Sequence, residues 1–123
     1  MNVCIDTNIL IYMANGSMSA EPIKQVSGYY ASISKIEGLC FGNLKVNEAM
    51  RILEFFAAYQ QLNLDDEIIN QAINLKQTKK RSLGDAIIAA TALVYDLPLW
   101  TANTKDFANI PGLKLFDVAE LKA

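Results

Sequence analysis

The chain has 123 residues, of which 52% are hydrophobic and 20% are charged, and its formal net charge is −2. This composition excludes a disordered or low-complexity chain and predicts a single domain, over residues 1–123, with a buried core. The chain contains no histidine, which excludes histidine-based catalysis and histidine ligation of a metal. We expect its two cysteines, Cys4 and Cys40, to be small buried residues that form neither a disulfide framework nor a zinc site. Any metal site must therefore use oxygen ligands.

The amino-terminal residues 1–6 lack the basic segment and the cleavage site of a secretory signal. No apolar run approaches the ~20 residues of a membrane-spanning helix. We therefore expect a cytoplasmic protein that does not enter a membrane. The net charge gives no sign of a strongly basic surface, so a nucleic acid would need a local basic patch or a bound metal.

Apolar runs and helical spacing alternate along the chain. Short apolar runs predict strands at residues 3–5, 29–33, 62–64, 98–101 and 113–116. Helical patterns between them predict helices at residues 8–13, 21–25, 35–41, 46–59, 67–80 and 84–94. This alternation predicts an α/β fold in three layers, with a short central parallel sheet of four to five strands and helices on both faces.

Acidic residues lie near the ends of the predicted strands. Asp6 directly follows the first strand, Glu37 lies just beyond the second, and Asp106 lies beyond the fourth. Asp85 arrives at the start of a buried helix. Ligands bind at the carboxyl edge of such a sheet, and carboxylates that converge there raise one another's pKa unless a cation is bound. The pattern predicts a Mg²⁺ or Mn²⁺ site that hydrolyses phosphodiesters through a metal-activated water.

The same acids have a simpler interpretation as helix caps. Ser34 stands three residues before Glu37 and Ser82 stands three residues before Asp85, which is the capping-box spacing. Residues 103–106 form a looser version. For any one acid taken alone, capping is the more common role. Their shared place at one sheet edge favours the metal site, whereas capping explains both serines.

Four blocks of the sequence, at residues 3–12, 32–42, 83–92 and 99–107, occur in a characteristic order and spacing. They resemble the PIN-domain ribonucleases, and most closely the VapC-type toxins of prokaryotic toxin–antitoxin pairs. The resemblance implies that the core acidic ligands are Asp6, Glu37 and Asp85. For the fourth ligand it implies an acid or an amide in the last block, which gives Asp106, with Asn103 as a possible contact. It also implies that Asn8 and Thr101 are polar residues that support the site.

The resemblance further implies Mg²⁺- or Mn²⁺-dependent cleavage of RNA, a homodimer and a small antitoxin protein that blocks the site. We therefore expect an endoribonuclease that is the toxin of a toxin–antitoxin pair. Two alternatives remain: a non-catalytic PIN-like binding module, and a phosphatase with Asp6 as its nucleophile. The phosphatase is disfavoured because such enzymes carry a second acid two residues on, where this chain has Asn8.

A dense basic cluster at residues 76–81 runs directly into the Asp85 block. It is either a phosphate-binding rim beside the metal site or a set of cations at the end of a helix, and the second interpretation is slightly favoured. Lysines also stand close to Glu37 and Asp106, where they contact phosphate or offset the charge of the acids. The candidate contacts with the RNA backbone are Lys35, Lys79, Lys80, Arg81 and Lys105.

Overall fold

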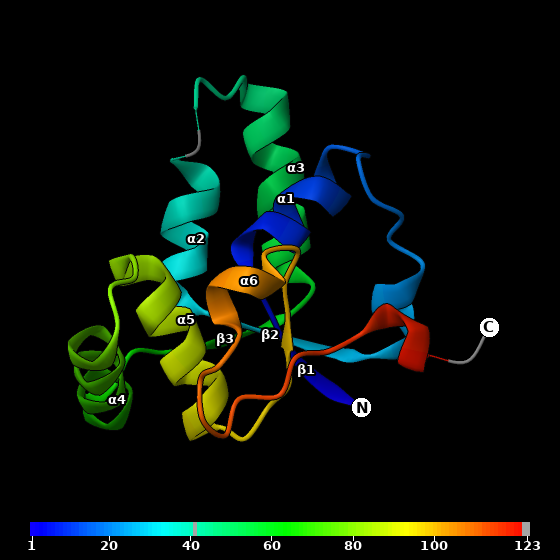
Figure 1. Ribbon diagram of the computed structural model, residues 1–123. Coiled ribbons are helices and arrows are strands. Elements are labelled where there is room, and N and C mark those ends of the chain that lie inside the picture. The colour runs from blue at the N-terminus through cyan, green and yellow to red at the C-terminus, as the bar shows by residue number, and fades with distance from the viewer. Residues whose placement is uncertain (41, 122–123) are drawn as a thin grey trace.

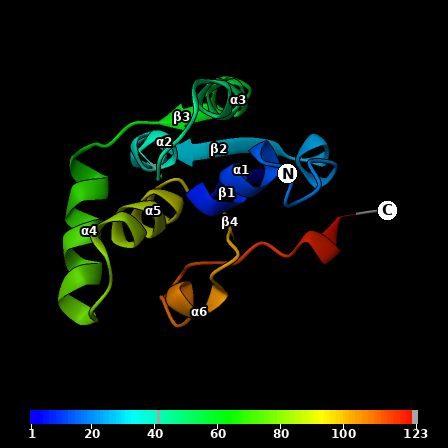
Figure 2. The same ribbon diagram turned by 90° about the horizontal axis from the view of Figure 1, so that it is seen from above.

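A computed structural model describes residues 1–40 and 42–121. Its sheet has four parallel strands in the order β3-β2-β1-β4, an order that can be followed in Figure 2. The strands are β1 (Asn2–Ile5), β2 (Ser27–Ala31), β3 (Gln60–Leu62) and β4 (Leu99–Trp100).

Helices connect and flank these strands, as Figure 1 shows. The α-helices are α1 (Thr7–Ala14), α2 (Ser32–Leu39), α3 (Val46–Ala57), α4 (Asp66–Thr78), α5 (Leu83–Val94) and α6 (Thr104–Phe107). Two short 3-10 helices are η1 (Pro22–Gln25) and η2 (Val118–Glu120). Among the described residues, no helix is both long enough and apolar enough to cross a bilayer.

Two apolar cores lie on opposite faces of the sheet, because successive side chains of a strand point to opposite faces. On one face Cys4 and Leu99 pack with residues of α4, α5 and α6. On the other face Val3, Ile5 and Trp100 pack with residues of α1 and α3. The predicted three-layer α/β fold is therefore confirmed.

The sheet differs from the prediction at two of its margins. The third strand begins at Gln60, two residues earlier than expected, because Gln60 and Leu62 pair with Tyr29 and Ala31 of β2. The predicted strand at 113–116 is reduced to a single parallel bridge between Leu99 and Leu115. Among the described residues the sheet thus has four strands, which is the lower of the two predicted numbers.

The second strand ends at Ala31 and α2 begins at the next residue, so both elements start earlier than predicted. The predicted helix end at Phe41 lies outside the described residues. Ser34 consequently stands inside α2, fully buried, and the predicted capping role for this serine is wrong. Ser82 does cap α5, because its hydroxyl accepts a hydrogen bond from the Asp85 backbone N–H at 3.1 Å.

The two cysteines lie in different environments. Cys4 is buried in β1, as expected, but Cys40 is exposed just after α2. The expectation that both are buried was wrong for Cys40, because α2 ends at Leu39 and the chain then leaves the core.

Candidate metal centre

Asp6 is fixed at the point where β1 passes into α1. It is the N-cap of α1 and is only 4% exposed. One carboxylate oxygen accepts a hydrogen bond from the Thr7 backbone N–H at 2.8 Å, and the other accepts one from the Thr101 hydroxyl at 2.7 Å. Thr101 directly follows β4, the neighbour of β1 in the sheet. The parallel pairing of these two strands therefore sets the position of the Asp6 carboxylate.

Three of the four predicted acids line one hollow of about 190 Å³ at the carboxyl ends of the strands. Asp6 comes from the start of α1, Asp85 from the first turn of α5, and Glu37 from the second turn of α2. The remaining lining residues are Thr7, Asn8 and Ile11. Asn8 thus borders the hollow.

The hollow places like charges close together in a partly desolvated setting. The pKa of Asp6 is raised to about 6, mainly by burial and in smaller part by the charges of Asp85 and Glu37. The hydrogen bonds from Thr101 and from the Thr7 backbone act in the opposite direction and lower the pKa. A cation in the hollow would relieve the repulsion and favour the ionised form of Asp6.

Asp85 has a raised pKa for a similar reason. Burial is the largest cause, and the charge of Asp106 adds to it, whereas Ser82 and Arg81 lower the pKa. Asp106 lies in the first turn of α6 and does not line the first hollow. It lines a second hollow of about 260 Å³, and Asp85 borders both.

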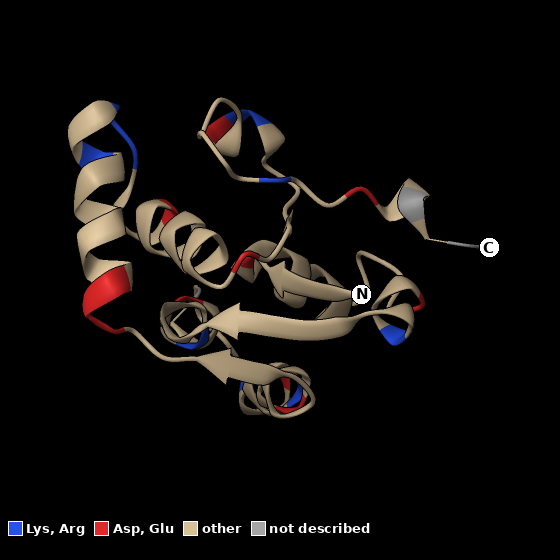
Figure 3. Cartoon of the chain, turned by 90° about the horizontal axis from the view of Figure 1, so that it is seen from below, with Lys and Arg blue, Asp and Glu red and all other residues tan. Residues whose placement is uncertain are grey.

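The second hollow is rich in basic residues. Its lining consists of Lys79, Lys80, Arg81, Ser82, Asp85, Lys105 and Asp106. Figure 3 shows the blue segment that follows α4, from which the first three of these residues come. Lys35 is exposed on α2 and lines neither hollow. Asn103 also lines neither hollow, although its backbone N–H donates to the Thr101 hydroxyl at 3.0 Å.

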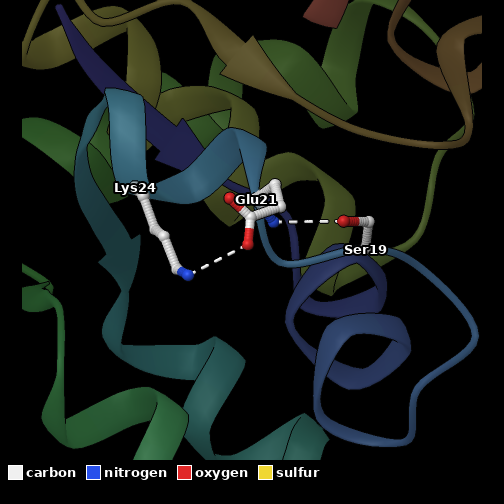
Figure 4. Close-up of polar contacts among 3 residues, drawn as sticks. All are labelled: Ser19, Glu21 and Lys24. Carbon is white, nitrogen blue, oxygen red and sulfur yellow. Dashed lines mark hydrogen bonds and ion pairs between the residues drawn. The ribbon is translucent and has the colours of Figure 1, made fainter.

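The acids have no cationic partner at salt-bridge distance in the part of the chain that the structure describes. The single ion pair there joins Lys24 and Glu21 at 3.0 Å, in and beside η1 (Figure 4). Ser19 accepts a hydrogen bond from the Glu21 backbone at the same turn. Because η1 precedes β2, this pair lies towards the amino end of that strand, away from the carboxyl edge where the acidic hollow lies.

The donor set of the hollow suits a hard divalent cation. It offers carboxylate oxygens, and Mg²⁺ or Mn²⁺ prefers oxygen ligands. Within residues 1–40 and 42–121, no three acidic or cysteine side chains are drawn together closely enough to hold an ion directly. A hydrated Mg²⁺ needs only one or two direct carboxylate ligands and reaches others through its waters. The hollow has room for such an ion.

The family of this chain follows from a match over most of its length. The family model described as PIN domain matches residues 3–113. The chain belongs to the PIN domain family. The resemblance inferred from the four sequence blocks is thereby confirmed.

Several relatives of this PIN domain are similar over nearly their whole length. It is 28% identical to the ribonuclease VapC of Rickettsia bellii, over 96% of this chain and 97% of that protein. It is 31% identical to a chain in a toxin–antitoxin complex from Klebsiella pneumoniae, with 97% and 99% coverage and a TM-score of 0.75. A chain of VapBC-1 from nontypeable Haemophilus influenzae is 25% identical, with 98% and 100% coverage and a TM-score of 0.79.

Two residues of this PIN domain's site were missed in the sequence. The Thr7 hydroxyl lies 2.6 Å from a carboxylate oxygen of Glu37 and 2.9 Å from the hydroxyl of Ser34. Both hydroxyls are buried. The only sign of them in the sequence is that Thr7 and Ser34 are polar residues on the inward faces of two helices. The sequence alone does not show that α1 and α2 meet there.

Proposed function

We propose that this chain is a metal-dependent endoribonuclease and the toxin component of a toxin–antitoxin pair. The observation that carries the proposal is the meeting of Asp6, Glu37 and Asp85, from three helices, around one hollow in a PIN domain. The relative from Rickettsia bellii is named as a ribonuclease, and the similar chain from Klebsiella pneumoniae comes from a toxin–antitoxin complex. Both names support the proposal.

We propose that Asp6, Glu37 and Asp85 hold Mg²⁺ or Mn²⁺, with Asp106 as the fourth acid. A divalent cation held by these residues would supply activation of a water and neutralisation of charge on a phosphate. Asp6 provides a fixed carboxylate because both of its oxygens are bound by Thr7 and Thr101. Asp106 lines the second hollow together with Asp85, and its charge raises the pKa of Asp85.

The RNA strand is proposed to cross the second, basic hollow. Lys79, Lys80, Arg81 and Lys105 line it, and Asp85 links it to the acidic hollow. Contacts between basic side chains and phosphates position a nucleic acid without reading its sequence. A strand bound there would present a phosphodiester bond to the carboxylates beside it.

The phosphatase alternative is disfavoured by the surroundings of Asp6. Such enzymes carry a second acid two residues after the nucleophile. The position two residues on is Asn8, which cannot serve as a second acid. The other alternative, a non-catalytic binding module, is distinguished from a nuclease by the cleavage experiment below.

We propose three further properties with the toxin function: a small antitoxin partner, a homodimer and a cytoplasmic location. Structures of related chains as toxin–antitoxin complexes support the antitoxin partner. Exposed apolar residues on two helices provide surface for partners, with Val46 and Met50 on α3 and Ile69 and Ile73 on α4.

The test is cleavage of RNA by the purified chain. We expect cleavage with Mg²⁺ or Mn²⁺, none after chelation with EDTA, and recovery when metal is added back. Asp6→Asn should abolish cleavage while the circular dichroism spectrum stays unchanged. Metal binding without RNA cleavage would identify the chain as the non-catalytic module. RNA cleavage that persists in EDTA would contradict the proposed mechanism.

A further inference from the structure

Glu37 differs from the other two acids of the hollow because it is exposed, whereas Asp6 is buried and Asp85 is half-buried. A free glutamate on a helix surface samples many rotamers, and ordering it costs conformational entropy. Its carboxylate nevertheless meets α1 on one side and α5 on the other. On one side the Thr7 hydroxyl lies 2.6 Å from Oε1.

On the other side, Oε2 of Glu37 occupies space left open by Gly84, in the first turn of α5. A Cβ atom at position 84 would approach Oε2 more closely than real Cβ atoms ever approach an oxygen. The backbone of Gly84 is a regular helical one, so the absence of a side chain is not needed for its conformation. What it provides is room for the carboxylate.

The hydrogen-bond chain at Thr7 has a defined direction. A carboxylate only accepts hydrogen bonds, and each hydroxyl carries one proton. Thr7 therefore donates to Glu37, and its oxygen accepts from the Ser34 hydroxyl 2.9 Å away. Ser34 stands one turn before Glu37 on α2 and is fully buried. The Glu37 side chain of α2 thus lies between the starts of α1 and α5. It is hydrogen-bonded to the first and fills open space at the second.

We infer that Thr7 and Gly84 are positioning residues for Glu37, and that the affinity of the hollow for a divalent cation depends on both. The inference rests on the proposed metal-dependent function and deepens it. Ligands fixed by surrounding residues bind a metal more tightly than ligands that must first be ordered, and losing such a support typically weakens binding by about 10- to 100-fold. Neither residue needs to touch the metal for this effect.

The test is the Mn²⁺ affinity of the full chain without RNA, measured by calorimetry. Thr7→Val, which removes the hydroxyl and keeps the shape, should weaken binding by about tenfold or more, and Thr7→Ser should restore it. Gly84→Ala should weaken binding similarly without lowering the melting temperature, because alanine favours a helix over glycine. The matched control is Thr91→Val, which removes a buried hydroxyl bound to the Ile87 carbonyl within α5 and should leave the affinity unchanged.

A double-mutant cycle separates positioning from general damage to the site. In a Glu37→Gln background, Thr7→Val and Gly84→Ala should have no further effect on Mn²⁺ affinity. Unchanged affinity in Thr7→Val, or an equal loss in the Glu37→Gln background, would overturn the inference, and Thr7→Val decides alone if Gly84→Ala fails to fold. If the unsubstituted chain binds Mn²⁺ but cleaves no RNA, only the proposed function fails. If it binds no Mn²⁺, both fail.

Discussion

Asp6 is a buried carboxylate whose charge is unfavourable in the metal-free protein. Its pKa rises to about 6 on folding, mainly through burial, from an ordinary value of 3.8. The folded state therefore binds more protons than the unfolded state between these two values, and stability falls as the pH rises through this window. Above this pH window, the ionised Asp6 carboxylate lowers the free energy of unfolding by about 3 kcal/mol.

The raised pKa of Asp6 predicts how the stability of the metal-free chain changes with pH. In EDTA, Asp6→Asn should raise the free energy of unfolding by ~1–3 kcal/mol at pH ~7.5, and the gain should shrink towards pH ~4. Asparagine keeps the capping oxygen and carries no charge at any pH. Urea denaturation at the two pH values measures the difference, with Asp66→Asn on the exposed start of α4 as the control. A gain that is the same at both pH values would contradict this account of Asp6.

At the scale of elements, helix starts hold the site together. Asp6 and Ser82 cap α1 and α5, so the capping interactions and the proposed metal ligands share the same turns. Asp65 caps α4 in the same manner, through a 2.9 Å bond from the Ile68 N–H, but does not line either hollow. The two caps on α4 and α5 therefore form a natural comparison.

We expect Ser82→Ala and Asp65→Ala to destabilise the chain by a similar amount, about 1 kcal/mol each. Only Ser82→Ala should also slow RNA cleavage, on the order of tenfold, because Ser82 supports Asp85. Thermal unfolding and cleavage rates measure the two effects. Equal cleavage rates in the two variants would show that the start of α5 contributes stability alone.

The sequence predicted the elements well where the pattern was local. Apolar runs that end at an acid located β1, and the serine-to-acid spacing located the start of α5. The same spacing failed at Ser34, because β2 ended earlier and turned that serine into a buried member of α2. The last residue of a strand is set by its pairing with the neighbouring strands, and this in turn sets which residue caps the following helix.

The sequence predicted that these acids come together, and three of the four do, but it did not predict the residues beside them. Asp6, Glu37 and Asp85 were marked by strand ends and by the family resemblance, and they line one hollow. The roles of Thr7 and Gly84 arise only where α1, α2 and α5 meet. No local pattern encodes such a meeting. The exposure of Cys40 likewise depended on where α2 ends.

At the scale of the whole molecule, a net charge of −2 must be reconciled with the proposed polyanionic substrate. The basic hollow answers this locally, since four cationic side chains gather beside Asp85. Affinity for RNA that rests on such contacts falls as salt rises, with a slope set by the number of phosphates neutralised. The overall charge of the protein is then of minor importance.

This view predicts the salt dependence of RNA binding. With the inactive Asp6→Asn chain and a labelled single-stranded RNA, the joint substitution Lys79→Ala and Lys80→Ala should reduce the slope of log affinity against log salt by about 1.4. Lys24→Ala, a lysine paired with Glu21 away from the hollow, should leave the slope unchanged. Fluorescence anisotropy measures both. Identical slopes for the two variants would exclude the basic hollow as the path of the RNA.

The measurement that tests the central claim most directly is the rate of RNA cleavage at saturating Mn²⁺ by the unsubstituted chain and by Asp85→Asn. Asp85 borders both hollows, so the proposed metal and the proposed RNA path meet at this one side chain. The account predicts that the substitution lowers the rate by on the order of 100-fold or more while the fold is retained. An unchanged rate in folded Asp85→Asn would contradict it.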